Sequence, residues 1–337
     1  MYVDMMWTLL PIELFHSISK DWDLLNKSYV NTPLLQSRFI SALLDEFQSG
    51  TEIIAICKEG KDIVAIAILF KQRPGFWQTF QPSQAPIGAW LQSPKYELQK
   101  LLPSLAKSLP GYCISLGITQ QDPDILPRPA STGHISTIDY IETARITITQ
   151  DFSEFWMSRG KNLRSNVKKQ LNRFEREGVD TRLEVVTIPD DISQAVSIYG
   201  KIESAGWKSE KGTSVNLNNS QGRFYTNLVS EYCNTLDGAI YQYWYDDEPV
   251  ATDLCVGEGS VVVILKTTYD ESHKKSSPGT LMHHAVFEHI FNENKYKKIE
   301  FYGRVMDWHK RWTTEIRVMY HVTYFRWKII DMIKKII

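Results

Sequence analysis

Strand-like and helix-like runs of apolar residues recur in the same order in the two halves of the chain. Period-two alternation of β-branched and aromatic residues predicts strands, and apolar residues three and four apart predict helices. The first half gives three strands, a helix and a strand, at 52–58, 62–70, 77–81, 96–109 and 112–116. The second half repeats this order at 239–245, 250–256, 260–268, 280–292 and 297–302. A repeat of this length predicts a duplicated αβ unit.

A helical region is predicted between the two repeats. An alternating strand at 144–149 leads into it, and Asp151 or Ser153 can cap its first helix. Over 161–177 the apolar positions recur at steps of four, four and three, which predicts one buried stripe. Its members are Leu163, Val167, Leu171 and Phe174. Two further helices are predicted, at 190–205 and 221–234.

The rest of the helix at 161–177 is basic. Its cationic residues are Lys161, Arg164, Lys168, Lys169, Arg173 and Arg176. Such a face is commonly just solvated, and Glu175 and Glu177 interrupt it here. It also suits binding of phosphates or of a polyanionic substrate. The sequence leaves both interpretations open.

Composition fits two globular domains and limits their partners. The chain has 337 residues, 43% hydrophobic and 23% charged, which excludes disorder and a coiled coil. The 38 Lys and Arg residues against 39 Asp and Glu residues give a net charge of -1. No bulk field therefore draws the protein to nucleic acid or to a membrane surface, and we expect no nucleic-acid partner.

The cysteines and the lengths of the apolar runs indicate in which cell compartment the protein is expected. The four cysteines are widely spaced, which favours reduced core thiols over a disulfide framework; they are Cys57, Cys113, Cys233 and Cys255. The N-terminus lacks a basic n-region, and the longest apolar runs fall far short of the roughly 18 residues of a membrane span. We expect a soluble, cytoplasmic protein without a transmembrane segment.

The segment Lys274-Lys275-Ser276-Ser277-Pro278-Gly279-Thr280 is the most informative for chemistry. It lies between the predicted strand 260–268 and the predicted helix 280–292. Small residues let a ligand approach the backbone, free N–H groups at a helix start bind phosphate, and lysines add positive charge. Pro278 suits the first turn of a helix. This context indicates an anion-binding loop.

The loop resembles a known motif. Lys274-x-x-Ser277-x-Gly279 is similar to the pyrophosphate loop, basic-x-x-Gly-x-Gly/Ala, of the GNAT superfamily of N-acetyltransferases. Further segments resemble its CelD-type branch, which is associated with cellulose and exopolysaccharide synthesis; these are 161–164, 203–208, 269–279 and 301–303. That branch is related to the Fem peptidoglycan aminoacyltransferases, which pair two GNAT-like units.

The resemblance implies an α+β fold of tandem GNAT-like units, each a mixed, mainly antiparallel sheet flanked by helices. Residues 1–145 would form a unit without its own cofactor site, because its nearest loop, Ala85-Pro86-Ile87-Gly88, lacks adjacent basic residues. Residues 146–337 would bind an acyl-CoA as cosubstrate, with acetyl-CoA as the first candidate. The acceptor would be an amino group of a sugar, a sugar nucleotide or a cell-surface glycan precursor.

The resemblance also implies two sets of binding residues. Those for the pyrophosphate are Lys274, Lys275, Ser277, Pro278, Gly279 and Thr280. Those for the substrate are Lys161, Asn162, Arg164, Glu203, Trp207, Lys208 and His309. His309 stands where the family tends to have a lysine, so Lys310 or Arg311 could take over an anion-binding role there.

An amine that attacks a thioester carbonyl loses a proton, so a base should lie nearby. Asp253 is the first candidate, because within 250–256 it shares a face with small residues, where a charge is unusual unless it is used or paired. A solvent-facing edge position is the alternative for Asp253. Glu300 is the second candidate. Tyr302 and His309 could protonate the leaving thiolate.

No metal site is predicted, because His283, His284 and His289 lack the i, i+4 spacing of zinc-binding helices. Two other functions remain open. One is Fem-like transfer from aminoacyl-tRNA, with the basic helix at 161–177 as the RNA contact. The other is a non-catalytic binding protein that kept the fold. A homodimer is left open under each.

Overall fold

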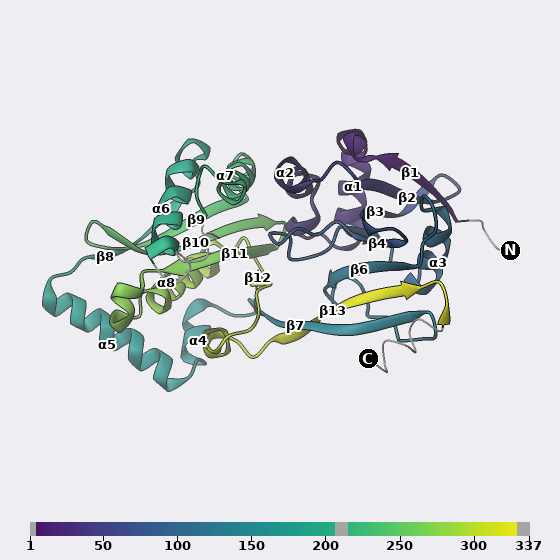
Figure 1. Cartoon of the computed structure of the whole chain (residues 1–337). Helices are drawn as coiled ribbons and strands as arrows, with labels where there is room; N and C mark the ends of the chain where they lie inside the picture. Colours follow the sequence, from purple (N-terminus) through teal and green to yellow (C-terminus); the bar gives the residue numbers. More distant parts are fainter. Residues whose placement is uncertain (1–4, 206–214, 329–337) are drawn as a thin grey trace. The chain divides into compact units, whose positions relative to one another are not determined.

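The structure is a computed structural model that describes residues 5–205 and 215–328. The chain divides into two compact units (Figure 1). Unit 1 comprises Met1–Thr143 and Arg317–Ile337, and unit 2 comprises Ala144–Ile316. Each unit has its own run of hydrogen-bonded strands, called its sheet below, and its own buried core.

This division differs from the expected domains 1–145 and 146–337 at the C-terminal end of the chain. The last strand, β13 (Ile316–Phe325), pairs with β6 (Ser115–Gln121) of unit 1. Backbone hydrogen bonds to a strand far away in sequence thus assign the end of the chain to the first unit. Such a long-range pairing leaves no local mark in the sequence.

The sheet of unit 1 has the strand order β1-β2-β3-β4-β6-β13, and β5 pairs with β3. The remaining strands are β1 (Met6–Pro11), β2 (Ile53–Glu59), β3 (Asp62–Arg73), β4 (Phe76–Thr79) and β5 (Trp90–Gln92). The helices are α1 (Phe15–Tyr29), α2 (Ser37–Phe47) and α3 (Leu98–Ser108). Four leucines on one side of α3 are buried in the core with residues of β2, β3 and β6. The sequence analysis predicted no helix or strand before residue 52. In this region the structure has β1, α1 and α2.

The sheet of unit 2 has the order β7-β12-β11-β10-β9-β8, and β7 (Ile135–Thr147) carries the chain into it from unit 1. The other strands are β8 (Thr181–Val186), β9 (Gly238–Tyr245), β10 (Glu248–Glu258), β11 (Val261–Tyr269) and β12 (Lys298–Glu300). The helices are α4 (Phe152–Met157), α5 (Lys161–Glu177), α6 (Ile192–Ala205), α7 (Ser220–Cys233), α8 (Pro278–Glu293) and α9 (Asp307–Trp312). The predicted α+β class with mainly antiparallel sheets flanked by helices is confirmed.

The predicted repeat is present in the two sheets. Unit 2 contains the order β9, β10, β11, α8, β12, and unit 1 contains β2, β3, β4, α3, β6 with the short strand β5 added between β4 and α3. In each unit the strands on either side of the helix are parallel: β4 with β6, and β11 with β12. Parallel neighbours need a long crossover, and α3 and α8 supply it.

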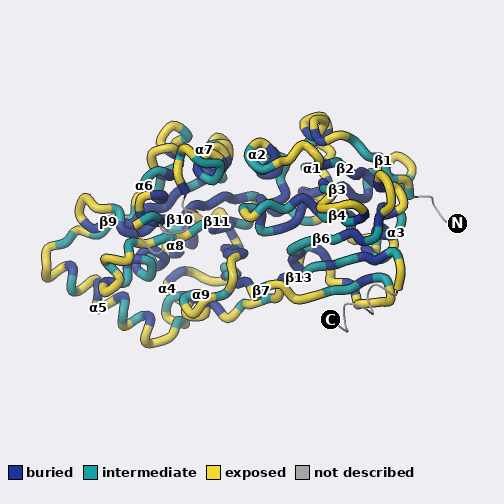
Figure 2. The backbone as a smooth tube through the Cα atoms, viewed as in Figure 1, coloured by how far each residue is buried: buried dark blue, intermediate teal, exposed yellow. Residues whose placement is uncertain are grey.

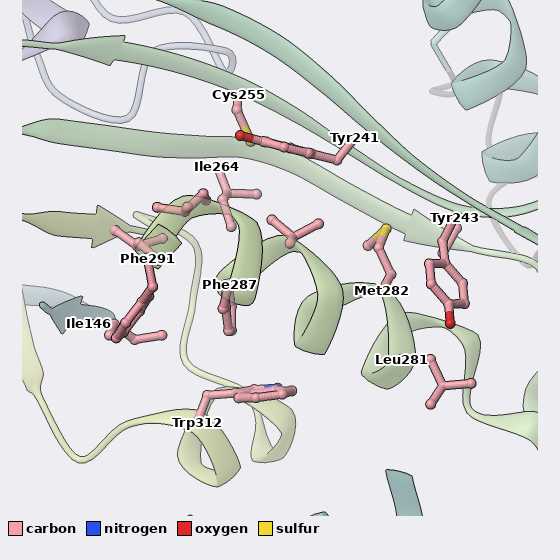
Figure 3. Close-up of a cluster of buried hydrophobic side chains, with 14 of the residues drawn as sticks. Ile146, Tyr241, Tyr243, Cys255, Ile264, Leu281, Met282, Phe287, Phe291 and Trp312 are labelled. Carbon is pink, nitrogen blue, oxygen red and sulfur yellow. The ribbon is translucent and has the colours of Figure 1, made fainter. Parts of the chain in front are cut away.

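Helix α8 is the centre of the core of unit 2. Met282 points from α8 toward the strands that carry Tyr241 and Tyr243, whereas Phe287 points to the other side, where its ring lies 4.9 Å from that of Trp312 of α9 (Figure 3). Each such side chain contributes roughly 1.5–3 kcal/mol by leaving water. α8 is therefore held tightly along its length, which fixes the position of its N-terminus.

Helix α5 lies at the surface of unit 2, and Figure 2 shows it as mainly exposed. The predicted stripe is wrong at one position, since Leu171 is 37% exposed. The buried residue is instead its neighbour Gln170, whose amide has a polar partner described below. Asp151 caps α4 as predicted, because its side chain accepts the Glu154 N–H at 2.8 Å.

The four cysteines are buried free thiols, as predicted. Burial raises the pKa of the Cys57, Cys113 and Cys233 thiols to about 11, so they stay protonated at neutral pH. Among the helices that the structure describes, none has the length and apolar character that crossing a membrane requires.

Candidate active site

The parallel strands β11 and β12 pair only at their beginning. Val261 to Val263 lie opposite Lys298 to Glu300, whereas β11 continues as far as Tyr269. Across β11, Leu254 pairs with Lys266 and Cys255 with Ile264, so β11 carries an extra residue at this point. A bulge of this kind bends a strand. The backbone of β11 beyond Val263 has no residue of β12 opposite it, because β12 ends at Glu300.

The loop predicted to bind an anion lies between β11 and α8. It is a short 3₁₀ helix, Glu271–Ser276, which Asp270 caps by accepting the Ser272 N–H at 2.8 Å. Ser277 follows in the left-handed conformation, with φ 58° and ψ 49°. That is the position of the first glycine in the resembling motif, and glycine adopts this conformation without strain. Serine therefore reproduces the backbone turn of the motif without its glycine.

The start of α8 offers backbone to a ligand. Pro278 has no N–H, and the N–H groups of Thr280 and Leu281 both donate to Ser277 O. Within the described residues, the Gly279 N–H has no hydrogen-bond acceptor. A Cβ atom added to Gly279 would meet the Tyr269 ring at 3.5 Å, an ordinary contact. With the exposed Lys274 and Lys275 beside it, this helix start suits a phosphate group.

Polar side chains from α5 and β9 hold the loop in place. Asn166 Nδ2 donates to Ser277 Oγ at 3.3 Å, and Gln170 Nε2 donates to Lys275 O at 3.2 Å. The Tyr245 hydroxyl donates to Ser276 Oγ at 3.1 Å. Sequence reasoning missed Asn166 and Gln170, although two amides four residues apart beside the apolar stripe could have indicated a polar partner.

The three catalytic candidates do not converge. Asp253 is fully buried on the α8 side of β10, where its Oδ2 lies 3.2 Å from His283 Nε2. Glu300 and Tyr302 alternate with Ile299 and Phe301, which belong to the core under α8. Glu300, the last residue of β12, therefore belongs to the opposite face of the sheet, whereas Tyr302 follows the strand in the left-handed conformation, with φ 51°.

Glu203 belongs to that same opposite face, where α6 and α7 pack. Its carboxylate accepts the Val215 N–H at 2.8 Å and the Tyr199 hydroxyl at 3.3 Å, and it lies 3.3 Å from Lys266 Nζ. Lys266 is the residue of β11 next to the bulge, and its ammonium also lies 5.6 Å from the Tyr225 ring. A buried carboxylate and a partly exposed ammonium thus lie beside the diverging strands.

His309 is placed differently from a substrate ligand. It is 5% exposed, its ring stacks on Trp308 at 3.6 Å, and its Nδ1 accepts the Met306 N–H at 3.0 Å. Burial, and secondly His283, lower its pKa to about 4. His309 is therefore neutral at pH 7 and offers no positive charge to an anion.

The other predicted substrate residues are dispersed. Lys161 and Asn162 are exposed in the first turn of α5, and Arg164 Nε donates to Arg159 O at 3.1 Å. Trp207 and Lys208 lie outside the described residues.

Histidines of α8 have separate partners in the structure. His284 packs edge-on against Trp156, at 4.4 Å between ring centroids, and His289 lies 3.3 Å from Glu293. In the described part of the chain, the group whose ligand atoms come close enough to hold a cation is Glu248, Asp270 and His273, within 4.8 Å of one another. Exposed acidic groups of this kind are common in proteins without a metal, so we assign no metal ion to these three residues.

Comparison with known proteins agrees with this geometry. Residues 161–311 match the family model described as "Acetyltransferase (GNAT) domain". This segment, 151 of the 337 residues, is similar to a GNAT acetyltransferase domain. The GNAT domain begins at α5, includes the loop and α8, and ends within α9. The prediction of an enzyme of the GNAT N-acyltransferase type is confirmed, whereas the CelD-type branch stays a prediction. No curated protein matches the chain.

Solved structures resemble more of the chain than the GNAT domain. The structure titled "Crystal structure of FemX" has a TM-score of 0.58 at 12% identity, over 97% of this chain and 99% of that one. A conserved protein of unknown function from Bacteroides thetaiotaomicron has a TM-score of 0.55 at 12% identity, over 95% and 100%. L-PGS from Bacillus licheniformis has a TM-score of 0.51 at 15% identity, over 93% and 94%. At these identities the similarity shows a shared fold that extends over both units.

Proposed function

We propose that the protein is an acyl-CoA-dependent N-acyltransferase, with acetyl-CoA as its first candidate cosubstrate. The acceptor is an amino group of a sugar, a sugar nucleotide or a cell-surface glycan precursor. The observation that carries the proposal is the loop before α8. Its left-handed Ser277, unbonded Gly279 N–H and paired lysines lie beside a strand that has left its parallel neighbour.

The loop residues fit the pyrophosphate of an acyl-CoA. Lys274 and Lys275 supply charge, the Gly279 N–H donates, and Ser277 and Thr280 bring hydroxyls to the same turn. The backbone of β11 beyond Val263 can pair with the amide groups of an extended chain, as an added strand would. An acyl-CoA supplies an acyl group activated as a thioester.

The transferred proton needs an acceptor on the side of the sheet that the amine enters. As the new C–N bond forms and the C–S bond breaks, the amine loses a proton and the leaving sulfur gains one. Glu300 and Tyr302 lie at the divergence of β11 and β12, which favours them as base and acid. Asp253 is enclosed under α8 with His283, so we assign it the lower rank.

Calorimetry with acetyl-CoA and a short acyl-CoA series, at two salt concentrations, tests the proposal. We expect one site per chain, and loss of binding when Gly279 is replaced by Leu. Gly279→Ala is the matched control, because its Cβ has room beside Tyr269. If Gly279→Leu binds acetyl-CoA as the parent chain does, the pyrophosphate site is not in this loop.

Turnover then ranks the candidate bases. Glu300→Gln and Tyr302→Phe should lower kcat with little change in acyl-CoA affinity, because each keeps the shape of the side chain. Asp253→Asn with full turnover would remove Asp253 as a base. If acetyl-CoA binds and no amine is acylated, the non-catalytic function is favoured.

A second candidate is a Fem-like transfer from aminoacyl-tRNA. It is supported by the exposed cations of α5 next to the loop and by the fold shared with FemX. It predicts RNA binding that weakens steeply with salt and that falls when Lys168, Lys169 and Arg176 are replaced by Ala. Binding of acetyl-CoA without binding of RNA would decide for the first candidate.

Location and assembly follow as parts of the proposal. An acyl-CoA cosubstrate is a metabolite of the cytoplasm, which supports a cytoplasmic enzyme. A homodimer stays a prediction that sedimentation equilibrium would test.

A further inference from the structure

Two adjoining pockets of unit 2 form a groove along α6. One, of about 460 Å³, is lined by the end of β8, the residues after it and the first half of α6. The other, of about 490 Å³, is lined by the second half of α6 and the turn between β9 and β10. They share Gln194, Ile198 and Trp244, so we treat them as one groove and call it the acidic groove. Each half has the size of a small-molecule site.

The walls of the acidic groove are negatively charged. Five carboxylates line it, namely Glu184, Asp191, Asp247, Glu248 and Asp270. Lys201 lines the second half, and His273 lies 3.3 Å from Glu248. Arg182 stacks on Trp244 at 4.8 Å and donates to Asp246 O. The five carboxylates outnumber the cations Lys201 and Arg182, so the acidic groove attracts a positively charged ligand.

Buried donors without partners also line the acidic groove. Gln242 is 2% exposed, and its Nε2 has no hydrogen-bond acceptor among the described residues. The same is true of the buried Nε1 of Trp244. Unpaired buried donors are costly, and an oxygen atom of a ligand would satisfy them. The lining thus calls for a ligand that offers oxygen acceptors as well as positive charge.

The acidic groove ends at the loop that carries the proposed cofactor site. Asp270 lines the second pocket and also caps the 3₁₀ helix of that loop through the Ser272 N–H. A chain bound in the acidic groove would therefore have one end beside the residues that begin the loop.

We infer that the acidic groove binds the acceptor, and that this acceptor is an oligomer of amino sugars with several protonated amines. The inference rests on the proposed function, because it names the acceptor of the same transferase. Ammonium groups match the carboxylates, and hydroxyl and ring oxygens match the donors of Gln242 and Trp244. A linear polyamine would match the carboxylates alone.

Calorimetry of the full chain with a glucosamine tetramer, its fully N-acetylated counterpart and spermine tests the inference. EDTA keeps divalent cations away from Glu248, Asp270 and His273. We expect the glucosamine tetramer to bind about tenfold more tightly than either other probe, and to weaken with salt. Equal or tighter binding of the N-acetylated tetramer or of spermine would overturn the inference.

Variants locate the site. The double variant Glu184→Gln and Asp247→Asn should weaken the glucosamine tetramer about tenfold, because it removes two charges from the two halves of the acidic groove. Glu288→Gln, an exposed carboxylate of α8, is the matched control and should change nothing. Unchanged binding in the double variant would overturn the placement.

Acetyl-CoA binding, measured on the same variants, separates this inference from the proposed function. Acetyl-CoA should bind the double variant as it binds the parent chain. If acetyl-CoA binds and the tetramer does not, the acidic groove fails as the acceptor site and the transferase stands. If the tetramer binds and no thioester does, the proposed function fails instead.

Discussion

The parallel pairs β4–β6 in unit 1 and β11–β12 in unit 2 occupy the same place in the repeated order and begin alike. Phe76 to Gln78 lie opposite Ser115 to Gly117, and Val261 to Val263 lie opposite Lys298 to Glu300. Beyond these residues the two pairs differ, and the difference decides which unit can hold a ligand between its strands.

In unit 1 the chain itself fills the place where the strands would part. Thr79 Oγ1 lies 2.7 Å from Thr119 Oγ1 and accepts the Thr119 N–H at 3.0 Å. The Gly88 N–H then donates to Thr119 O at 3.3 Å. A Cβ atom on Gly88 would lie 2.5 Å from Thr119 O, so this segment fits tightly against β6. The backbone of unit 1 is thereby paired within the unit.

In unit 2, β11 carries a bulge and continues beyond the end of β12, and the helix that follows has a positively charged start. α8 starts after two lysines, whereas α3 has Glu97 at its N-cap. A carboxylate at a helix start repels phosphate, and lysines attract it. A duplicated unit can thus lose a ligand site by filling it with its own backbone and reversing the charge at one helix start.

The largest expected effect comes from removing the charge at the start of α8. Lys274→Ala with Lys275→Ala should weaken acetyl-CoA binding by at least about 100-fold, because two charge-assisted contacts of about 1.5 kcal/mol or more each are lost. Calorimetry measures it. Lys100→Ala with Lys107→Ala, in α3 of unit 1, is the matched control and should leave the affinity unchanged. If both double variants lost the same affinity for acetyl-CoA, the proposed difference between the two helix starts would be wrong.

The next effect concerns acid stability, since each unit holds a partly or fully buried histidine whose pKa is lowered. Burial is the first cause for both His309 in unit 2, to about 4, and His321 in unit 1. The unfolded chain takes up the His309 proton near pH 6.5, so stability falls as the pH drops from about 6.5 to 4, by at most about 3 kcal/mol.

Thermal unfolding between pH 7 and pH 4.5 measures this loss. His309→Gln should flatten the decline more than His321→Gln, because His309 is buried and His321 is only partly buried. His16→Gln, at an exposed position of α1, should leave the decline unchanged. A decline that persists in full in His309→Gln would contradict a neutral, buried His309.

A smaller effect distinguishes two glycines. Gly88→Ala should lower the free energy of unfolding by about 1–3 kcal/mol, because its Cβ has no room beside Thr119 and Thr79. Gly279→Ala should change it by less than about 1 kcal/mol, since alanine is tolerated in a first turn. Urea unfolding compares the two. A Gly88→Ala variant of unchanged stability would mean that the segment around Gly88 can move away from Thr79 and Thr119 at little cost.

The smallest effect is at Ser277. Ser277→Gly should raise the free energy of unfolding by about 1 kcal/mol, because glycine adopts the left-handed conformation without strain. Acetyl-CoA binding should be kept. Ser272→Gly, in the same loop with no left-handed φ, should give no such gain. A loss of stability in Ser277→Gly would show that the contact with Asn166 outweighs the strain.

Much of the fold was predictable, because the strands of both repeats are apolar runs bounded by turns, and short-range pattern marks them. The errors lie where a distant partner decides. Leu171 was expected inside the stripe, yet the Gln170 amide takes the buried place because Lys275 O lies within its reach. The last strand, β13, belongs to unit 1 because its backbone is hydrogen-bonded to β6.

The candidate site was predictable as a loop and less so as a set of residues. The loop is contiguous, so its lysines, small residues and proline are visible together. Asp253, Glu300 and Glu203 lie on different strands and a helix, and only the folded sheet shows that Asp253 is on one face and the other two on the opposite face. The amides that hold the loop come from α5, more than 100 residues earlier.

The sequence by itself determined the repeated order of elements, the buried thiols and the position of the basic loop before α8, because each depends on neighbours along the chain. Only the tertiary structure decided that the gap of unit 1 is filled. The Thr79 and Thr119 hydroxyls that fill it are 40 residues apart, as are other groups joined only by folding. Local chemistry predicts an anion-binding loop in the second repeat alone, and the long-range pairing of Thr79, Gly88 and Thr119 shows how the first repeat is closed.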